Sequence, residues 1–175
     1  MSGNLHSPLQ PPDVFFLTAS VGWMELGDLK EAELELRRID PALEGHPDVL
    51  EGWWMLHAAR KDWQSALESA HALTVACPKS VHGWLHCSYA SRRAPGGGLA
   101  VAWEILRKAY EDFPREPTVS YNLACYACQL GHMDEARDWL QKACKAGGEA
   151  TILKMATGDT DLEPLWPELL KKTSG

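Results

Sequence analysis

Hydrophobic residues along this chain recur every three or four positions, the spacing that places them on one side of an α-helix. Two such runs follow each other near the start of the sequence: Phe16, Ala19, Trp23 and Leu26, and then Leu29, Ala32, Leu36 and Ile39. Gly27 and Gly131 stand between paired runs, where a left-handed residue can end the first helix. No segment alternates apolar and polar residues for long enough to form a strand, so we expect an all-α fold.

The helical runs repeat along the chain. One series of positions consists of Ala32, Ala66, Ala102 and Ala136, and a second consists of Ile39, Leu73, Ala109 and Ala143. Both series advance by 34, 36 and 34 residues, whereas the upstream series Phe16, Leu50, Trp84 and Ser120 advances by 34, 34 and 36. The registers disagree only across the Pro/Gly-rich stretch RRAPGGG. A two-residue insertion in a loop at that stretch accounts for both series.

Paired helices every 34 residues, with a small residue at the close crossing, resemble the tetratricopeptide repeat (TPR) family. The resemblance covers four units, residues 13–46, 47–80, 81–116 and 117–150, and the fourth matches best through YNLACYACQLGHMDEA. It implies a right-handed superhelical solenoid of antiparallel helix pairs. Arg60 and Lys61 depart from the family pattern, which usually has an apolar residue and a glycine there, and Gly148 replaces the usual closing proline.

The two ends of the chain lie outside the repeats. Residues 1–12 are rich in proline and polar groups, so we expect a flexible lead-in. Residues 151–175 are expected to form a capping segment and tail, because a terminal repeat would otherwise expose its apolar face. Ile152, Leu153 and Met155 are expected to pack on the last pair. Asp159 or Asp161 is expected to cap a final helix that presents Leu162, Leu165 and Trp166.

The charge of the 175-residue chain argues against a nucleic-acid partner. Seventeen basic and 24 acidic side chains give a net charge of −7, and phosphate binding requires a basic face. The acidic stretch from Glu25 to Glu51 favours a cationic partner, and the alternative is a solvated acidic surface. No apolar stretch approaches the roughly 20 residues of a membrane helix, and the N-terminus does not resemble a signal peptide. We therefore expect a cytoplasmic protein without a membrane partner.

Two pairs of potential ligands interrupt this pattern. Cys125 and Cys128 fall in the middle of a helix with no strand before it, so we interpret them as packing or groove-lining residues. A redox or zinc site is the alternative, with only His132 and Cys144 nearby in the sequence. His82 and His86 have the i, i+4 spacing that suits a divalent metal. No carboxylate is placed in the sequence to complete a set, so we expect a surface or groove pair, no cofactor and no catalysis.

The TPR resemblance also implies a concave groove lined by the first helix of each unit. Carried over position by position, the expected peptide- or partner-binding residues are Leu17, Val21, Met24, Asp48, Glu51, Met55, His82, Leu85, Tyr89, Arg92, Tyr121 and Cys125. Family members that hold the C-terminal carboxylates of heat-shock chaperones use a lysine, asparagine and arginine clamp. That clamp is absent, because the matching positions are Leu17, Val21, Gly52, His82 and His86.

These observations predict a non-catalytic protein–protein interaction scaffold that binds a cationic or amphipathic peptide or partner helix. One alternative is a small secretion-type or assembly chaperone of the TPR class. A second is a metal- or thiol-dependent protein that uses the Cys125/Cys128 and His82/His86 pairs. A third is weak self-association through the apolar end of the groove.

Overall fold

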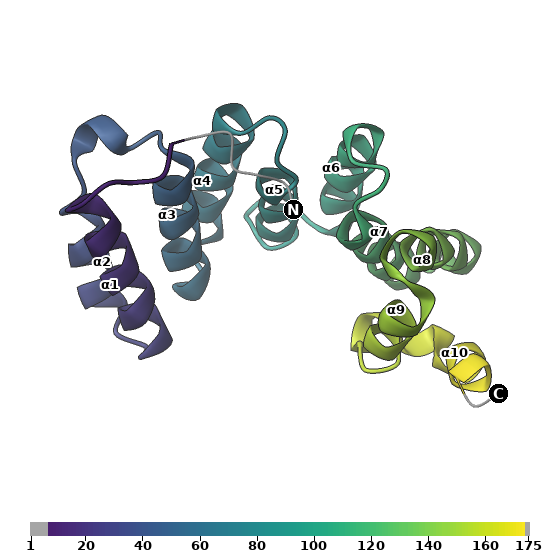
Figure 1. The fold of residues 1–175 in the computed structure, drawn as a ribbon. Coiled ribbons are helices and arrows are strands. Elements are labelled where there is room, and N and C mark those ends of the chain that lie inside the picture. The colour runs from purple at the N-terminus through teal and green to yellow at the C-terminus, as the bar shows by residue number, and fades with distance from the viewer. Residues whose placement is uncertain (1–6, 174–175) are drawn as a thin grey trace. The chain divides into compact units, whose positions relative to one another are not determined.

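The computed structural model of this protein describes residues 7–173, and within them it contains ten α-helices, two 3-10 helices and no strand (Figure 1). The all-α expectation is therefore confirmed. The chain divides into two compact units, residues 1–96 and residues 97–175. The division falls inside the loop that the sequence predicts as an insertion, which links a helix ending at Ser91 to one beginning at Leu99.

Unit 1 consists of consecutive helices that pack on their neighbours. These are α1 (Asp13–Glu25), α2 (Leu29–Leu36), the 3-10 helix η1 (Pro41–Leu43), α3 (Pro47–Ala59), α4 (Trp63–Ala76) and α5 (His82–Ser91). Helix α1 pairs with α2, and α3 pairs with α4. Contacts of α2 with α3, of α4 with α5 and of α1 with α3 then join each pair to the next one. We call α1, α3 and α5 the first helices of this unit.

Unit 2 begins with α6 (Leu99–Asp112) and contains the pair α7 (Pro117–Gln129) and α8 (Met133–Gly147). The C-terminal segment follows as α9 (Glu149–Ala156), the 3-10 helix η2 (Thr160–Leu165) and α10 (Trp166–Thr173). Helix α6 packs on α7, α9 packs on α8, and η2 packs on α7. The C-terminal segment therefore covers both helices of the α7–α8 pair.

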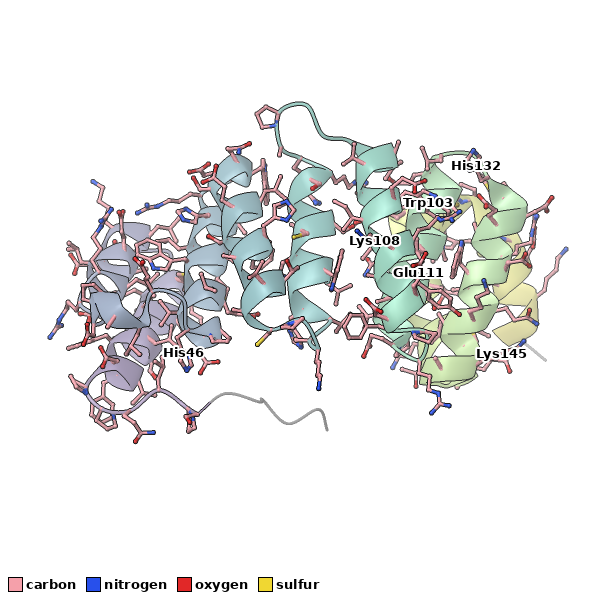
Figure 2. All side chains as sticks on the ribbon, turned by 90° about the horizontal axis from the view of Figure 1, so that it is seen from above. His46, Trp103, Lys108, Glu111, His132 and Lys145 are labelled. Atoms are coloured by element: carbon pink, nitrogen blue, oxygen red, sulfur yellow. The ribbon has the colours of Figure 1, made fainter. Side chains whose placement is uncertain are left out.

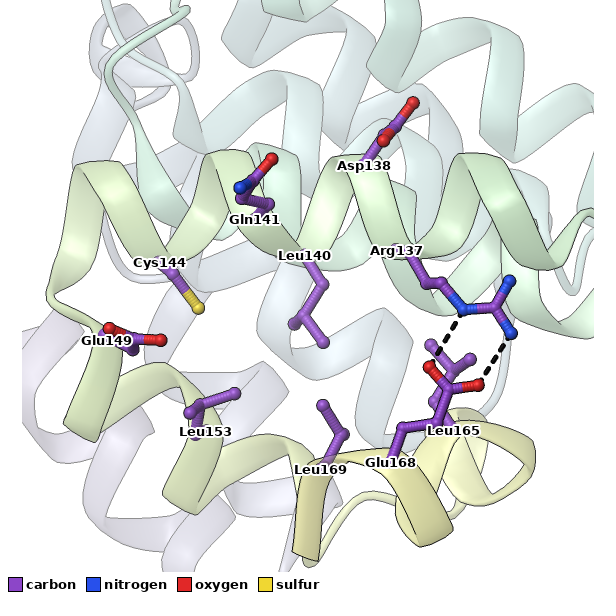
Figure 3. A pocket seen from close by; sticks show the side chains of 10 residues that line it. All are labelled: Arg137, Asp138, Leu140, Gln141, Cys144, Glu149, Leu153, Leu165, Glu168 and Leu169. Atoms are coloured by element: carbon purple, nitrogen blue, oxygen red, sulfur yellow. Dashed lines mark hydrogen bonds and ion pairs between the residues drawn. The ribbon is translucent and has the colours of Figure 1, made fainter. Parts of the chain in front are cut away.

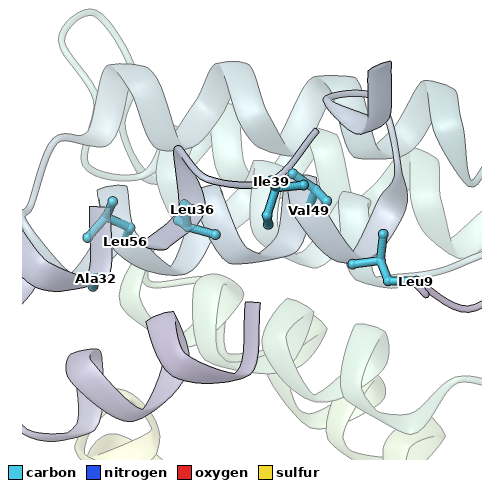
Figure 4. Packing of buried hydrophobic residues seen from close by; sticks show 6 residues of the cluster. All are labelled: Leu9, Ala32, Leu36, Ile39, Val49 and Leu56. Carbon is cyan, nitrogen blue, oxygen red and sulfur yellow. The ribbon is translucent and has the colours of Figure 1, made fainter. Parts of the chain in front are cut away.

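The repeated small residues are fully buried. Ala32, Ala66, Ala102 and Ala136 are all 0% exposed, as a close helix crossing requires. In unit 1 the core is built around a cluster of buried apolar side chains (Figure 4). Its members are Leu9, Ala32, Leu36, Ile39, Val49 and Leu56. Burial of such side chains, at about 25 cal/mol per Å² of apolar surface, is the main favourable contribution to folding.

Leu9 in that cluster differs from the expectation for the N-terminal segment. Residues 1–6 of the predicted flexible lead-in lie outside the described residues, but Leu9 is buried against the core of unit 1. The segment is also tied down by His46, the residue labelled before α3 in Figure 2, whose Nε2 donates to the carbonyl oxygen of Ser7 at 2.9 Å. Residues 7–12 therefore pack against unit 1. Leu9 supplies the apolar contact, which the polar, proline-rich composition of this segment does not indicate.

The turns inside three helix pairs share one backbone conformation. Gly27, Lys61 and Gly131 all have positive φ, at 82°, 59° and 83°. Lys61 adopts it without the freedom of glycine. Its neighbour Arg60, which also departs from the family pattern, connects the α3–α4 pair to α2 of the preceding pair. The guanidinium of Arg60 donates to the carbonyl oxygen of Leu29 at 2.7 Å and lies 2.6 Å from Glu33.

Gly83 marks the closest approach between α4 and α5. A Cβ atom added at Gly83 would lie 2.8 Å from the backbone nitrogen of Thr74, which cannot move away without shifting α4. Gly22 in α1 is the opposite case, because a Cβ added there would meet nothing within 4 Å. Gly83 is therefore required for packing, whereas Gly22 carries only the general cost of a glycine inside a helix.

We predict opposite effects for the same substitution at these two sites. Gly83→Ala should lower the free energy of unfolding of unit 1 by about 1–3 kcal/mol, the usual cost of overpacking. Gly22→Ala should raise it by about 0.5–1 kcal/mol, because alanine is the better helix former. Urea unfolding followed by circular dichroism measures both. A Gly83→Ala variant as stable as the wild type would contradict the close α4–α5 contact.

Candidate functional site

The predicted binding residues fall on two surfaces of different character. Nine of them lie on the first helices of unit 1 and the tenth, Arg92, caps the C-terminus of α5. We call this set the first-helix face: Leu17, Val21, Met24, Asp48, Glu51, Met55, His82, Leu85, Tyr89 and Arg92. All ten are partly or fully exposed. The other two, Tyr121 and Cys125, lie on α7 of unit 2 and are buried.

Helix α1 contributes the apolar end of the first-helix face. Leu17 and Met24 are partly buried and pack against the core cluster, so they also stabilise the fold. Gly52 of α3 lets the two helices approach, since a Cβ at that position would lie 2.7 Å from Cδ1 of Leu17. Substitutions at Leu17 or Met24 would therefore disturb folding as well as any binding.

Glu51 and the two histidines connect α3 to α5. Nε2 of His86 donates to Oε1 of Glu51 at 2.9 Å, and Nδ1 of His82 lies 4.0 Å from the same oxygen. The hydrogen bond from His86 lowers the pKa of the Glu51 carboxyl group below its usual value, against the opposing effect of burial. No carboxylate stands beside the histidine pair in the sequence, and the fold supplies one from the preceding first helix.

An aromatic cluster holds the exposed ring of Tyr89 in place. Trp54 of α3 stacks on His86 with ring centroids 3.6 Å apart, and its edge meets Tyr89 at 6.1 Å. Trp63 at the start of α4 also makes an edge contact with Tyr89, with ring centroids 5.8 Å apart. The guanidinium of Arg93 lies 3.7 Å from the Tyr89 ring centroid, a cation–π distance. Tyr89 is nevertheless 43% exposed and can contact another molecule.

A cleft of about 360 Å³ opens beside Glu51 and His82. Residues of α3, α4, the α4–α5 connection and the start of α5 line it: Pro47, Asp48, Glu51, Leu73, Cys77, Ser80 and His82. Desolvation is the largest cause raising the pKa of the Cys77 thiol, and the nearby carboxylates of Asp48 and Glu51 raise it further. Cys77 is therefore predominantly a neutral thiol near neutral pH.

The corresponding face of α7 is closed by the C-terminal segment. The hydroxyl of Tyr121 donates to Oδ2 of Asp159 at 3.0 Å, and Sγ of Cys125 lies 3.6 Å from the same oxygen. Burial raises the pKa of both side chains well above their usual values. Leu162 and Leu165 of η2 are also buried. Tyr121 and Cys125 thus contact the protein's own chain in this structure.

The C-terminal segment itself follows the expectation in part. Asp159 caps η2 by accepting a hydrogen bond from the backbone nitrogen of Asp161 at 3.0 Å. Ile152 and Leu153 are buried as expected, whereas Met155 is 51% exposed. The exposure of Met155 follows from helix geometry, because position 155 lies about 60° beyond the face shared by 152 and 156 at 100° per residue.

A small pocket separates α8 from the C-terminal segment (Figure 3). Its volume is about 290 Å³, and Leu140, Leu153, Leu165 and Leu169 line its apolar part. Arg137 of α8 closes one end with two hydrogen bonds to Glu168 of α10, at 2.9 and 2.7 Å. The remaining lining residues are Asp138, Gln141, Cys144 and Glu149. The exposed ion pair between Arg137 and Glu168 and the leucine side chains of the pocket hold α10 against α8.

The thiol pair is not part of a ligand cluster. Among the described residues, Glu51, His82 and His86 form a group whose donor atoms lie within metal-binding reach, and Cys125 and Cys128 belong to no such group. His132, at the turn between α7 and α8 in Figure 2, pairs with Glu135 at 3.2 Å, and Cys144 lines the pocket under α8.

The described part of the chain also has no helix with the length and apolar character needed to cross a membrane.

Comparisons with known proteins identify the architecture. The sequence matches no protein-family model, and no curated protein matches it. A crystal structure of a thermophilic TPR protein from Thermus thermophilus superposes with a TM-score of 0.61 over 93% of this chain and 97% of that one. The chain has the TPR fold. With 19% sequence identity, this likeness describes the fold and not a shared partner.

Some contacts at the first-helix face were not predicted, and the repeat period of the TPR fold indicates one of them. Trp54, Trp63 and Arg93 were not expected at the binding face, although they position Tyr89. Residues about one repeat apart occupy neighbouring first helices, and Glu51 and His86 are separated by 35 positions. The repeat period therefore could have paired this carboxylate with the histidines.

The burial of the thiols predicts an order of chemical reactivity. Burial raises the pKa of Cys87 to about 12 and also raises the pKa values of Cys125 and Cys128. Since the thiolate is the nucleophile, brief treatment of folded protein with an alkylating reagent should modify Cys77 and Cys144 first. Mass spectrometry of the peptides measures this. Modification of Cys125 or Cys128 as fast as Cys144 would show that the C-terminal segment does not cover α7.

Proposed function

We propose that this chain is a non-catalytic protein-interaction scaffold that binds a peptide segment or partner helix on the first-helix face of unit 1. The observation that carries the proposal is the contrast between the two sets of predicted binding residues. The set in unit 1 keeps partly exposed apolar and acidic groups and the exposed ring of Tyr89, whereas Tyr121 and Cys125 are buried. The TPR fold itself supports the class of function, since it generally mediates protein–protein interaction.

The chemistry of the first-helix face favours an amphipathic partner with basic side chains. Val21, Met55 and Leu85 supply apolar surface, and Asp48 with Glu51 supplies negative charge on α3. A peptide laid across these helices would bury apolar side chains and place lysine or arginine near the carboxylates. Tyr89 is an aromatic anchor, because its ring is exposed and also packs against neighbouring aromatic side chains.

The cysteines support a cytoplasmic location for this scaffold. None of the five forms a disulfide in the structure, as is usual where thiols stay reduced. The net charge of −7 supports a protein partner rather than a nucleic acid.

The proposal predicts that binding depends on the first-helix face and not on the second helices. A variant carrying Val21→Glu and Tyr89→Ala should lose its partner, because it removes the aromatic anchor and places a charge on the apolar surface. The matched control carries Leu34→Glu and Val75→Ala, at exposed apolar positions of α2 and α4. Affinity capture from a lysate of the source organism, with quantitative mass spectrometry, compares both variants with the wild type.

We expect a specific partner to be retained by the wild type and the control, and to bind the first-helix variant at least about 10-fold more weakly, a loss typical of interface hot spots. Circular dichroism establishes that both variants are folded. Equal retention by all three proteins, or a loss confined to the control variant, would overturn the assignment of the first-helix face.

A further inference from the structure

Three side chains from two first helices of unit 1 bring nitrogen and oxygen donors together. Glu51 lies on α3, and His82 and His86 lie one turn apart on α5. Their donor atoms all lie within 4.8 Å of one another. Two imidazoles and one carboxylate form a donor set typical of transition-metal sites in proteins.

Two of the three donor separations are close to those of a tetrahedral site, and the third, between the two imidazole nitrogens, is within 4.8 Å. Bonds of about 2.0 Å to zinc place two tetrahedral ligand atoms about 3.3 Å apart. The observed separations from Oε1 of Glu51 are 2.9 Å to Nε2 of His86 and 4.0 Å to Nδ1 of His82. Each differs from the ideal by less than about 1 Å, a change that rotation of the exposed His82 side chain can supply without moving either helix.

Neighbouring side chains fix the orientation of two of the three proposed ligands, His86 and Glu51, before any metal binds. His86 is oriented by the stacked ring of Trp54, 3.6 Å away, and by the contact of its Nε2 with Glu51, where a bound metal ion would replace the proton on Nε2. His82 is the adjustable ligand, with a side chain that is 64% exposed. The cleft beside Glu51 and His82, which Asp48 and Cys77 also line, gives an ion and its waters access to the donors. A rigid pair with one adjustable ligand and an open approach suits reversible metal binding.

We propose that Glu51, His82 and His86 bind one divalent transition-metal ion of the zinc type and thereby link α3 to α5. Imidazole nitrogen selects Zn²⁺ and similar ions over Mg²⁺ and Ca²⁺, which prefer all-oxygen ligand sets. The three protein ligands leave the fourth position to water, on the side of the cleft. Metal binding stabilises the α3–α5 contact and so rigidifies the central part of the first-helix face.

The test is a titration of the chelator-treated, reduced full-length chain with Zn²⁺ by isothermal calorimetry. His82→Gln removes one ligand at an exposed position, and Glu51→Gln keeps the shape of the side chain and an acceptor for His86. His132→Gln is the matched control, because His132 is similarly exposed and lies 3.2 Å from the carboxylate of Glu135 without a second imidazole. Thermal melting without metal establishes that all variants fold.

We expect one equivalent of Zn²⁺ to bind the wild type and the control equally. His82→Gln and Glu51→Gln should each weaken binding by more than about 10-fold, the smallest loss expected even for removing an outer partner of a metal ligand. Wild-type protein that takes up no Zn²⁺, or ligand variants that bind it as tightly as the control, would overturn the proposal and leave a hydrogen-bonded Glu–His cluster.

Substitution of Co²⁺ separates this site from the cysteines. A nitrogen and oxygen ligand set gives visible d–d bands without the near-ultraviolet charge-transfer band of cobalt thiolates. A thiolate band that disappears in Cys77→Ser would instead assign the ion to Cys77 and contradict the ligand set. Neither the Zn²⁺ titration nor the Co²⁺ spectrum involves a protein partner. A negative result in either would therefore contradict the metal site and not the proposed scaffold function.

Discussion

The helices of this protein cross closely at positions that admit no side chain larger than a methyl group, and the packing of successive helices depends on that constraint. Ala32, Ala66, Ala102 and Ala136 are completely buried at positions related by the repeat. At Gly83 even a methyl group would collide with the backbone of α4. Small residues at a crossing let two helix axes approach toward the lower end of the usual range of about 8–10 Å. Close crossings bring successive first helices of unit 1 near enough for Glu51 and His86 to form a hydrogen bond.

The same helix packing has different consequences in the two units. In unit 1 the first helices meet through a mixed set of carboxylate, imidazole and aromatic side chains that remains partly exposed. In unit 2 the C-terminal segment returns over α7, where Asp159 accepts the hydrogen bond from Tyr121 and Leu162 is buried. A terminal helix pair needs such a cover to keep apolar surface from water. The cover of α7 leaves the first helices of unit 1 as the surface on which we base the proposed function.

Sequence periodicity was sufficient to predict the helices, because their pairing is local and the buried alanines repeat. Contacts that bring back a distant, aperiodic segment were not predictable in the same way. Leu9 docks from a polar, proline-rich stretch, and the closure over Tyr121 comes from a 3-10 segment 38 residues away. The residues on α1, α3 and α5 could be proposed from repeat register alone. Their individual chemistry, above all the Glu51–His86 contact, required coordinates.

Hydroxyl-radical footprinting of tyrosines tests most directly whether the first-helix face of unit 1 is the open and working surface. In free protein, Tyr89 at 43% exposure should be modified much faster than Tyr121 at 7%. In the complex with its captured partner, Tyr89 should become protected while Tyr121 keeps its low rate. Equal modification of the two tyrosines in free protein, or a Tyr89 rate that the partner leaves unchanged, would contradict this assignment.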